Sequence, residues 1–547
     1  MRCSSTRLFI AVLLVLSLVV PLPALAIDQS DLLKKIEDLT KELDKVKQQM
    51  QDIQKKDEAK EQRITKVEKK ADEAKKPSWL EIGGDYRFRL DSLKGNVHDY
   101  MQYDPTTQYG PLPSPIPGVN MYTYSRPTNG YDPKNDTLMT NRFGLNLRAR
   151  ATEDITVKAR LLMYKVFGGS DSGAVSDQFF SPDKSGVFDG NFGHIPQDNV
   201  LRVDQAFATW SNIANLPVWF SVGRRPSTGG VPSNIRQNKE YSGNSGVPAL
   251  LVDYAFDGMT LGVAPDIDAL PGAYAKLCYG RGFDSGLRPG NNGLKDTDMI
   301  GLNVVPYDTD NLRVEFQWNR AFNMMSNPPI DTWGNVQANV GDIDQFGGLV
   351  MGKINNVGPG DLNLFASAAM SRSHPSGNTY SLPFGYMDMN GNGVFDAGDM
   401  QFTGDYGLLN DGNSKDGHSG AAVYLGARYD LKSTGTKIGL EYNHGSKYWI
   451  AFAPASDDMW ASKLGTRGNV YEAYVIQEIK SKPISKFGKA YARLGFQHYD
   501  FNYTGSNGWL GEPRKISDLN MTNPMDTQMY PPLRKADNIY LTFDVEF

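Results

Sequence analysis

The sequence predicts an all-β, antiparallel transmembrane barrel of about 16 strands, preceded by an α-helical coiled coil. The chain begins with an export signal and ends on a strictly alternating strand. Between these two segments, many stretches alternate apolar and polar residues, and the connections between them are short at one end and long at the other. Together these three observations favour a barrel of three parts: residues 1–26, 27–76 and 77–547.

Residues 1–26 are predicted to be a signal peptide. Arg2 and Arg7 precede the apolar run at 8–20, and Ala24-Leu25-Ala26 is a typical cleavage site. Removal of this segment leaves Cys278 as the single cysteine, so no internal disulfide is expected. No later segment offers about 20 consecutive apolar residues, so no membrane-spanning helix is expected.

Residues 27–76 are predicted to form a coiled coil. Apolar residues recur in steps of four and three from Leu32 to Ala74, with Asp57 and Lys60 interrupting the seam. A seven-residue repeat of this length needs a partner helix, because a lone helix would expose its apolar stripe. The alternative is a solvated single helix or a linker. Pro77 ends the helical pattern.

After Pro77 the apolar period changes to two, which predicts strands. We expect sixteen of them, at residues 79–91, 140–151, 155–167, 199–211, 217–225, 247–264, 273–283, 298–306, 311–321, 345–356, 361–373, 419–431, 436–448, 468–480, 488–501 and 537–547. Asp257-Gly258 inside the sixth segment is a hairpin signal, so eighteen strands is the alternative count.

The last strand reads N-I-Y-L-T-F-D-V-E-F over residues 538–547, with apolar residues at every second position. It resembles the terminal strand of bacterial outer-membrane barrels. That resemblance implies that Phe547 is a signal read by the barrel-assembly machinery, and that outer-membrane lipid surrounds the barrel. Both ends of the predicted barrel fall on the short-turn side, which places the coiled coil in the periplasm.

The polar face of the early strands is predicted to line a water-filled lumen and to be strongly basic. The predicted pore-lining residues are Arg87, Arg89, Arg142, Arg148, Arg150, Lys158, Arg160, Arg313 and Glu315. A basic wall of this kind attracts anions. The alternative is that these charges pair across strands and only keep the lumen wet. The third long connection, 227–247, is expected to fold inward if the chain follows the pattern of porins.

Residues 388–399 match the spacing of a twelve-residue calcium loop. Gly393 takes the position of the sharp turn, and an Asp replaces the usual Glu at the last position. The predicted ligands are Asp388, Asn390, Asn392, Val394 through its carbonyl, Asp396 and Asp399. We expect a structural Ca²⁺ here, with an Asn/Gly-rich surface turn as the alternative. No other cofactor, no catalytic residue and no nucleic-acid partner is expected.

The mature chain resembles porins of Gram-negative bacteria that carry an N-terminal coiled coil. It is also similar to an uncharacterised family of porin-like proteins in which the strand W-L-E-I-G-G-D-Y-R-F-R-L-D, here 79–91, follows the coiled coil. The resemblance implies a homotrimeric outer-membrane channel, passive or weakly selective, for small hydrophilic solutes. The alternatives are a structural anchor tethered through its coiled coil, or a sheath for an electron-transfer partner.

Overall fold

The computed structural model describes residues 79–168, 196, 198–239, 246–327, 336–453 and 458–547, and five helical positions near the N-terminus, Lys34, Glu37, Thr40, Lys41 and Lys45. The chain divides into two units, residues 1–78 and 79–547. The predicted signal peptide and nearly all of the predicted coiled coil lie outside the described residues, so both stay predictions. Among the described residues, no helix is long and apolar enough to cross a membrane.

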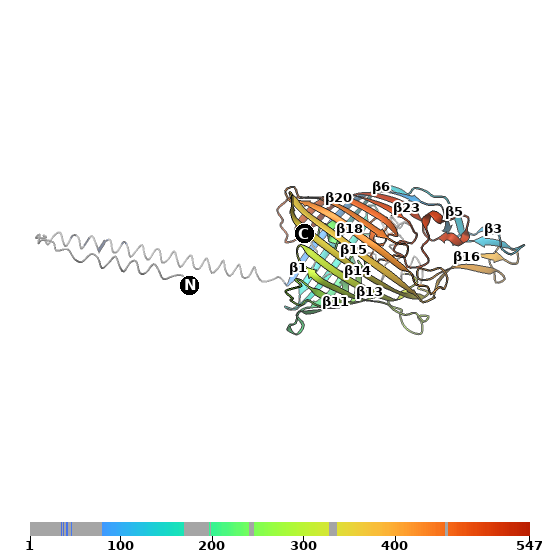
Figure 1. Ribbon diagram of the computed structural model, residues 1–547, viewed down its shortest axis with the longest axis horizontal. Helices are drawn as coiled ribbons and strands as arrows, with labels where there is room; N and C mark the ends of the chain where they lie inside the picture. Colours follow the sequence, from blue (N-terminus) through green and yellow to red (C-terminus); the bar gives the residue numbers. More distant parts are fainter. Residues whose placement is uncertain are drawn as a thin grey trace. The chain divides into compact units, whose positions relative to one another are not determined.

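Sixteen strands close into one antiparallel barrel (Figure 1). In chain order they are β1 (Leu80–Val97), β6 (Lys134–Arg150), β7 (Ile155–Val166), β8 (Arg202–Trp210), β9 (Val218–Pro226), β10 (Ala255–Val263), β11 (Tyr274–Phe283), β12 (Thr297–Asp308), β13 (Leu312–Met325), β14 (Asn339–Val357), β15 (Gly360–Pro375), β18 (Ser419–Leu431), β19 (Thr436–Gly445), β20 (Gly468–Glu478), β21 (Lys489–Phe501) and β23 (Leu533–Glu546). The first and last strands pair, with Asp85 opposite Glu546. The chain therefore enters the barrel wall and leaves it at the same rim.

The predicted sixteen-strand barrel is confirmed, and each predicted strand overlaps one observed strand. Several strand boundaries differ from the prediction by up to six residues, and one start is wrong by eight. The predicted strand 247–264 begins only at Ala255, and Asp257-Gly258 lies within β10 rather than at a turn, so the eighteen-strand alternative is also wrong. The apolar run at 247–254 does not alternate. It packs inside the barrel instead of joining the wall.

Alternating burial on β23 shows how the sequence sorts the two faces of the wall. Ile539, Leu541 and Phe543 are 54%, 44% and 42% exposed on the outside. Their neighbours Asn538 and Thr542 are buried on the inside. A period of two therefore produces an apolar exterior and a polar interior, as a barrel surrounded by lipid requires.

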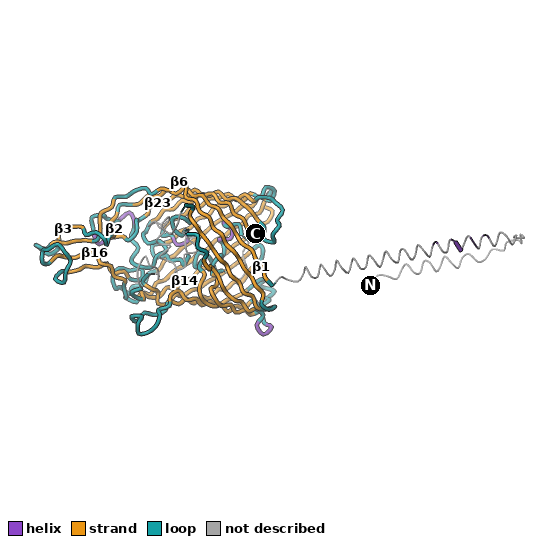
Figure 2. Tube along the Cα trace, turned by 180° about the vertical axis from the view of Figure 1, so that it is seen from behind, coloured by secondary structure: helices purple, strands orange, loops and turns teal. Residues whose placement is uncertain are grey.

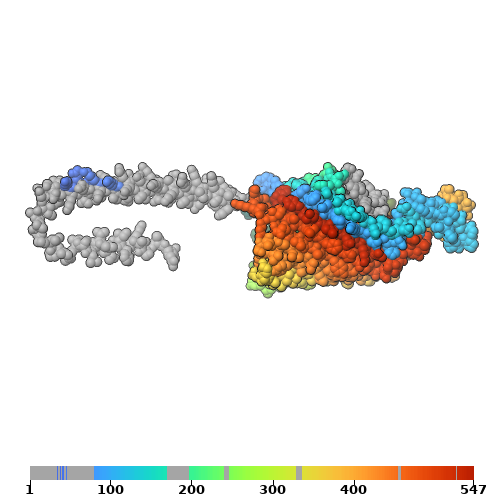
Figure 3. Space-filling view, turned by 90° about the horizontal axis from the view of Figure 1, so that it is seen from above, coloured from blue at the N-terminus to red at the C-terminus, as the bar shows by residue number. Residues whose placement is uncertain are grey.

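The long connections build two small sheets beyond one end of the barrel, which we call the long-loop end (Figure 1). One sheet has the order β17 (Met400–Tyr406), β16 (Tyr380–Asp388), β4 (Asn120–Thr123) and β3 (Tyr109–Pro113). The other contains β22 (Thr527–Gln528), β2 (Tyr100–Tyr103) and β5 (Ser125–Thr128). Segments far apart in sequence thus lie side by side at this end (Figure 3).

The described helices are all short and lie in connections. They are α4 (Ser233–Arg236), η4 (Ile213–Asn215), η5 (Lys463–Gly465), η6 (Ile516–Asp518) and η7 (Pro524–Asp526). Of these, α4 and η5 belong to segments that enter the barrel, and their residues are mostly buried.

The C-terminal residue takes part in closing the barrel. The Phe547 N–H donates to the Gly84 carbonyl at 3.0 Å, and the Gly84 N–H donates to the Phe547 carbonyl at 2.8 Å. The Phe547 ring stacks on Phe143, with ring centroids 6.4 Å apart. The last residue therefore contacts the first two strands of the barrel wall.

Deletion of Phe547 is expected to reduce the amount of assembled barrel. The deletion removes both hydrogen bonds to Gly84 and an aromatic contact with Phe143 worth about 1 kcal/mol. Heat-modifiable migration of unboiled protein in gel electrophoresis measures the folded fraction. Phe547→Trp, which keeps the aromatic ring and the backbone bonds, is the control. Equal folded fractions for the deletion and the control would contradict this prediction.

Candidate functional site in the barrel lumen

The third long connection leaves β9, enters the barrel and returns to β10. We call its described first part, residues 227–239, the strap and its second part, 246–254, the return limb. The strap contains α4, and Val231, Ile235 and Arg236 are buried. It makes contact with β20, which is eight positions from β10 in the sixteen-strand order and therefore on the opposite wall. The strap thus spans the lumen.

Four side chains of the far wall hold the end of the strap by its main-chain carbonyls. The carbonyls of residues 235, 236, 237 and 238 accept hydrogen bonds from Arg428, Arg493, Tyr491 and Lys489, respectively. The Arg493 and Tyr491 bonds measure 2.8 and 2.6 Å. The last carbonyls of a helix have no partner within the helix, so donors on the wall satisfy them. Three of the four donors are cationic, which suits a helix C-terminus.

A buried ion cluster fixes the strap by its side chain as well. Arg236 Nη1 lies 2.8 Å from Asp458 Oδ1 and 3.1 Å from Glu472 Oε2. Lys463 Nζ lies 2.6 Å from the same Glu472 oxygen and also contacts Glu441. All five side chains are at most 10% exposed. Two cations thus face three carboxylates in a region where an unpaired charge would be costly.

Tyrosines of the wall complete this cluster. The hydroxyls of Tyr424 and Tyr474 donate to Glu441 at 2.6 and 3.1 Å, and Tyr540 donates to Glu472 at 2.6 Å. These bonds occupy carboxylate oxygens that the cations alone would leave unsatisfied, which a buried ion network requires.

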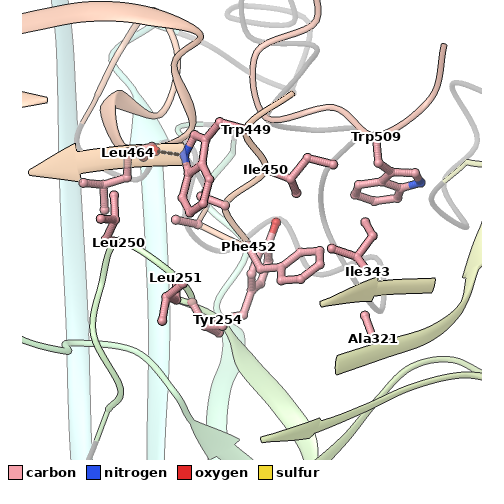
Figure 4. Close-up of a cluster of buried hydrophobic side chains, with 14 of the residues drawn as sticks. Leu250, Leu251, Tyr254, Ala321, Ile343, Trp449, Ile450, Phe452, Leu464 and Trp509 are labelled. Atoms are coloured by element: carbon pink, nitrogen blue, oxygen red, sulfur yellow. Dashed lines mark hydrogen bonds between the residues drawn. The ribbon is translucent and has the colours of Figure 1, made fainter. Parts of the chain in front are cut away.

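A second segment enters the lumen from the connection between β19 and β20. Its described residues, 446–453 and 458–467, pack on the return limb: the Phe452 N–H donates to Leu251, and the Asp253 N–H donates to Phe452, both at 2.8 Å. Trp449, which is fully buried, donates from its indole to the Leu464 carbonyl (Figure 4). We call the strap, the return limb and this second segment together the luminal plug. Figure 2 shows loops crossing the inside of the barrel.

The plug has an apolar core of its own inside the polar barrel. It comprises Ile235, Val247, Leu250, Leu251, Val252, Tyr254, Trp449, Ile450, Phe452 and Leu464, packed against wall residues such as Ile343, Phe365 and Tyr424 (Figure 4). A barrel of sixteen strands is too wide for its inward side chains alone to fill. Folded loop segments take up that space here.

The structure places most of the predicted pore-lining arginines in ion pairs. Arg87 binds Asp544 at 2.5 Å, and Arg89 binds Asp91 at 2.7 Å. The remaining pairs are Arg160 with Asp85 (2.7 Å) and Asp204 (3.5 Å), Arg142 with Asp85 (3.7 Å), and Arg313 with Glu315 (2.9 Å) and Asp308 (2.6 Å). For these positions, the charges pair across and along strands.

Three predicted cations differ from this pattern. Arg148 is 42% exposed and lies 3.4 Å from Glu81. Arg150 and Lys158 have no ion-pair partner within the described part of the chain, and Lys158 lies over the Phe207 ring at 6.0 Å. All three lie near the short turn between β6 and β7, with Arg148 opposite Lys158 in the pairing of those strands. The excess positive charge of the wall is therefore at this end of the lumen.

The predicted calcium loop forms a compact turn between β16 and β17. Asp388 accepts the N–H groups of Gly391 and Gly393 at 2.7 and 2.8 Å, and Gly393 has a φ of +72°. Asp399 accepts the N–H groups of Met389 and Asp396, both at 2.9 Å. The carboxylates of Asp388 and Asp399 therefore accept hydrogen bonds from backbone amides of the turn, as expected for this spacing of Asp, Asn and Gly residues.

Asp396 is at the centre of the remaining contacts of this turn. It accepts the side-chain amides of Asn390 and Asn392 at 2.8 and 2.7 Å. A hydrogen bond from the Gly398 N–H, followed by those two amides, lowers its pKa. Among the described residues, no group of three or more His, Cys, Asp or Glu is close enough to hold a metal ion. The oxygen types fit Ca²⁺, while the carboxylates as placed are satisfied by N–H donors.

The described histidines do not form a nucleophile–base pair. Ring nitrogens of His374 and His498 bind Asp344 and Asp537, and the other three described rings, His98, His418 and His444, bind a main-chain carbonyl or an Asn side chain. Within the described residues, the strong titratable clusters are the ion pairs of the lumen.

Comparison with family models assigns the chain. A model described as "protein of unknown function" (DUF3373) matches residues 132–547. The chain belongs to this family. No curated protein matches the sequence.

Solved structures to which this chain is similar include two proteins, OmpT and OmpF. OmpT of Vibrio cholerae in its trimer form is 11% identical, with 86% of this chain and 99% of that chain covered and a TM-score of 0.36. OmpF of Salmonella typhi in complex with daunomycin is 11% identical, with 85% and 97% covered and a TM-score of 0.39.

Replacement of Arg236 by Met is expected to loosen the strap. The change leaves Asp458 without its cation and Glu472 with only Lys463, and breaking a buried pair in this way costs about 3 kcal/mol. Hydrogen exchange of residues 227–239 should accelerate. Arg202→Met, which breaks the more exposed pair with Asp198, is the control. Unchanged exchange in the Arg236 variant would show that the strap does not depend on this cluster.

Proposed function

We propose that the protein is an outer-membrane channel for small hydrophilic solutes, with its long-loop end outside the cell and its conductance limited by the luminal plug. The observation that carries the proposal is a closed barrel with an apolar exterior whose polar interior is crossed by the plug. The plug is made of loop segments attached by side chains, so it can move without breaking the strand pairing of the wall.

The three cations near the short turns support an anion preference. Arg148, Arg150 and Lys158 are on the interior face where no buried carboxylate fully balances them. Fixed positive charge at a pore mouth raises the local concentration of anions and lowers that of cations. Because these groups face water, salt should screen their effect. The other predicted pore-lining cations contribute little, since carboxylates neutralise them.

Substitution of Arg148 and Arg150 by Glu is expected to shift the permeability of the pore toward cations. The anion-to-cation permeability ratio, measured as the reversal potential of a planar bilayer in a salt gradient, should fall by at least about twofold. Lys415→Glu, a charge reversal at an exposed position of the connection between β17 and β18, far from the short turns, is the control. A pore that prefers cations from the start, or does not respond to the double variant, would contradict the anion preference.

The turn at 388–399 is proposed to bind Ca²⁺ as a structural ion. Bound calcium would replace the amide donors of Asn390 and Asn392 at Asp396 and hold the β16–β17 connection rigid. Its role would be to stabilise the small sheet that β16 and β17 form with β4 and β3.

The calcium proposal predicts metal-dependent protection from proteolysis. Calcium should slow cleavage within residues 374–418 of the parent, and should have no effect on a variant with Asp388→Ala and Asp399→Ala. Asp416→Ala, in the same connection but outside the turn, should keep the calcium response. Equal cleavage of the parent with and without calcium would mean that the turn is stabilised by its own hydrogen bonds alone.

The second candidate function is a structural anchor, and the apolar core of the plug is the observation that favours it. A lumen filled by packed apolar side chains suits a barrel that does not conduct. Absence of single-channel conductance in both the folded parent and Arg236→Met would favour the anchor. The homotrimer and the tethering role of residues 27–76 stay predictions.

A further inference from the structure

A cavity of about 620 Å³ lies at the long-loop end of the barrel. Its walls come from the connection after β21, from the segment around β17 and from the end of the luminal plug. A volume of this size suits a small organic molecule. Arg148, Arg150 and Lys158, the cations near the short turns, do not line this cavity.

The walls of the cavity are held in place by hydrogen bonds. Arg467 is 1% exposed and donates to the carbonyls of Thr504, Gly505 and Gly508 at 3.1, 2.7 and 2.6 Å. It also donates to the Trp449 carbonyl of the plug at 3.2 Å. One guanidinium thus fixes a whole loop against the plug, and a cavity fixed in this way loses little entropy when a ligand binds.

Seven aromatic rings contribute to the lining, and the two indoles direct their polar atoms to the protein. The lining rings are Phe384, Tyr406, Trp460, Phe501, Tyr503, Trp509 and Tyr530. Trp460 donates to the Asp537 carbonyl at 2.9 Å, and Trp509 donates to the Met325 carbonyl at 2.8 Å. The indole rings therefore offer apolar faces without a polar group that a ligand has to satisfy.

The charges around the cavity are largely paired and, in total, acidic. Arg514 contacts Asp411, and Glu512 binds Lys447 at 2.7 Å. Asp405 already accepts the hydroxyls of Ser381 and Thr403. The lining contains four carboxylates against two guanidinium groups. An anionic ligand would therefore meet net repulsion.

We propose that this cavity binds an uncharged solute carrying aromatic or other apolar rings. Ring faces of the ligand stack on the aromatic lining, which supplies the affinity. A hydroxyl-rich solute such as a sugar fits less well, because it offers fewer apolar ring faces to stack on the aromatic lining. The inference does not rest on conduction, because binding at this site can occur in a barrel that never opens.

Two probes with one ring skeleton test the proposal. N-phenyl-1-naphthylamine is uncharged, and 1-anilinonaphthalene-8-sulfonate carries a sulfonate on the same rings. Titration of the folded full-length protein in amphipol, followed by probe fluorescence, should give saturable binding of the neutral probe. The sulfonate should bind at least about tenfold more weakly, because it places an anion among carboxylates.

Variants locate the binding in the cavity. Tyr406→Ser with Tyr503→Ser should weaken neutral-probe binding by about tenfold, since two ring contacts are lost. Met529→Trp, at another lining position, should weaken binding by filling the space. Tyr109→Ser, a tyrosine of β3 away from the cavity, should bind like the parent. Heat-modifiable migration confirms that each variant is folded.

Several results would overturn the proposal. Equal probe binding by the parent and all folded variants would mean that the probe partitions onto the apolar exterior of the barrel. Equal or tighter binding of the sulfonate would contradict the neutral ligand class. A saturable response to sucrose with none to the naphthylamine would assign the cavity to hydroxyl-rich solutes instead. Conductance measurements play no part in these outcomes, so failure here is separate from failure of the proposed channel.

Discussion

The contact of Arg236 with Asp458 and Glu472 is the interaction on which the interior of this barrel depends. It joins the strap, the second inward segment and β20 at one point, and Lys463 extends it to Glu441 on β19. A cation that is buried in the lumen needs an opposite charge beside it. Asp458 belongs to the plug, whereas Glu441 and Glu472 belong to the barrel wall. The strap therefore has one position in which all of these charges are paired. The main-chain bonds to Arg493 and Tyr491 then become available.

The size of the barrel explains why loop segments fill it. Inward side chains of sixteen strands cannot meet across the lumen, so the space holds either water or folded chain. Here the chain supplies an apolar core from the return limb and the second segment, and that core needs no polar partners. The wall contacts the plug through hydrogen bonds and ion pairs, such as those of Arg493 and Glu472, and through apolar side chains such as Ile343 and Phe365. Stability of the wall and position of the plug are therefore largely separate properties, since strand pairing satisfies the backbone of the wall without the plug.

The architecture of the wall could be predicted from sequence because it depends on a period of two, which each strand carries locally. The sixteen strands and the outward direction of Ile539, Leu541 and Phe543 follow from that period. The apolar stretch at 247–254 was assigned to the wall because a short apolar run does not reveal whether it lies in a strand or a packed loop. Its lack of alternation is the signal that could have separated the two. The partners of Arg87 and Arg236 lie 457 and 222 or more residues away, so spacing along the chain contains no trace of them.

The plug and the cavity at the long-loop end share a side chain, and this links two parts of the molecule that otherwise differ in chemistry. Arg467 holds the Trp449 carbonyl of the plug and the carbonyls at 504, 505 and 508 of the cavity wall. Displacement of the second segment from the lumen would therefore remove a support of the cavity. A packed connection of this kind has two arrangements rather than a continuous range, because a buried guanidinium either keeps its acceptors or loses several at once. The connections available for coupling between cavity and lumen include Arg467, the Lys447–Glu512 ion pair, and the hydrogen bond from the Asn507 side chain to the Ala453 carbonyl.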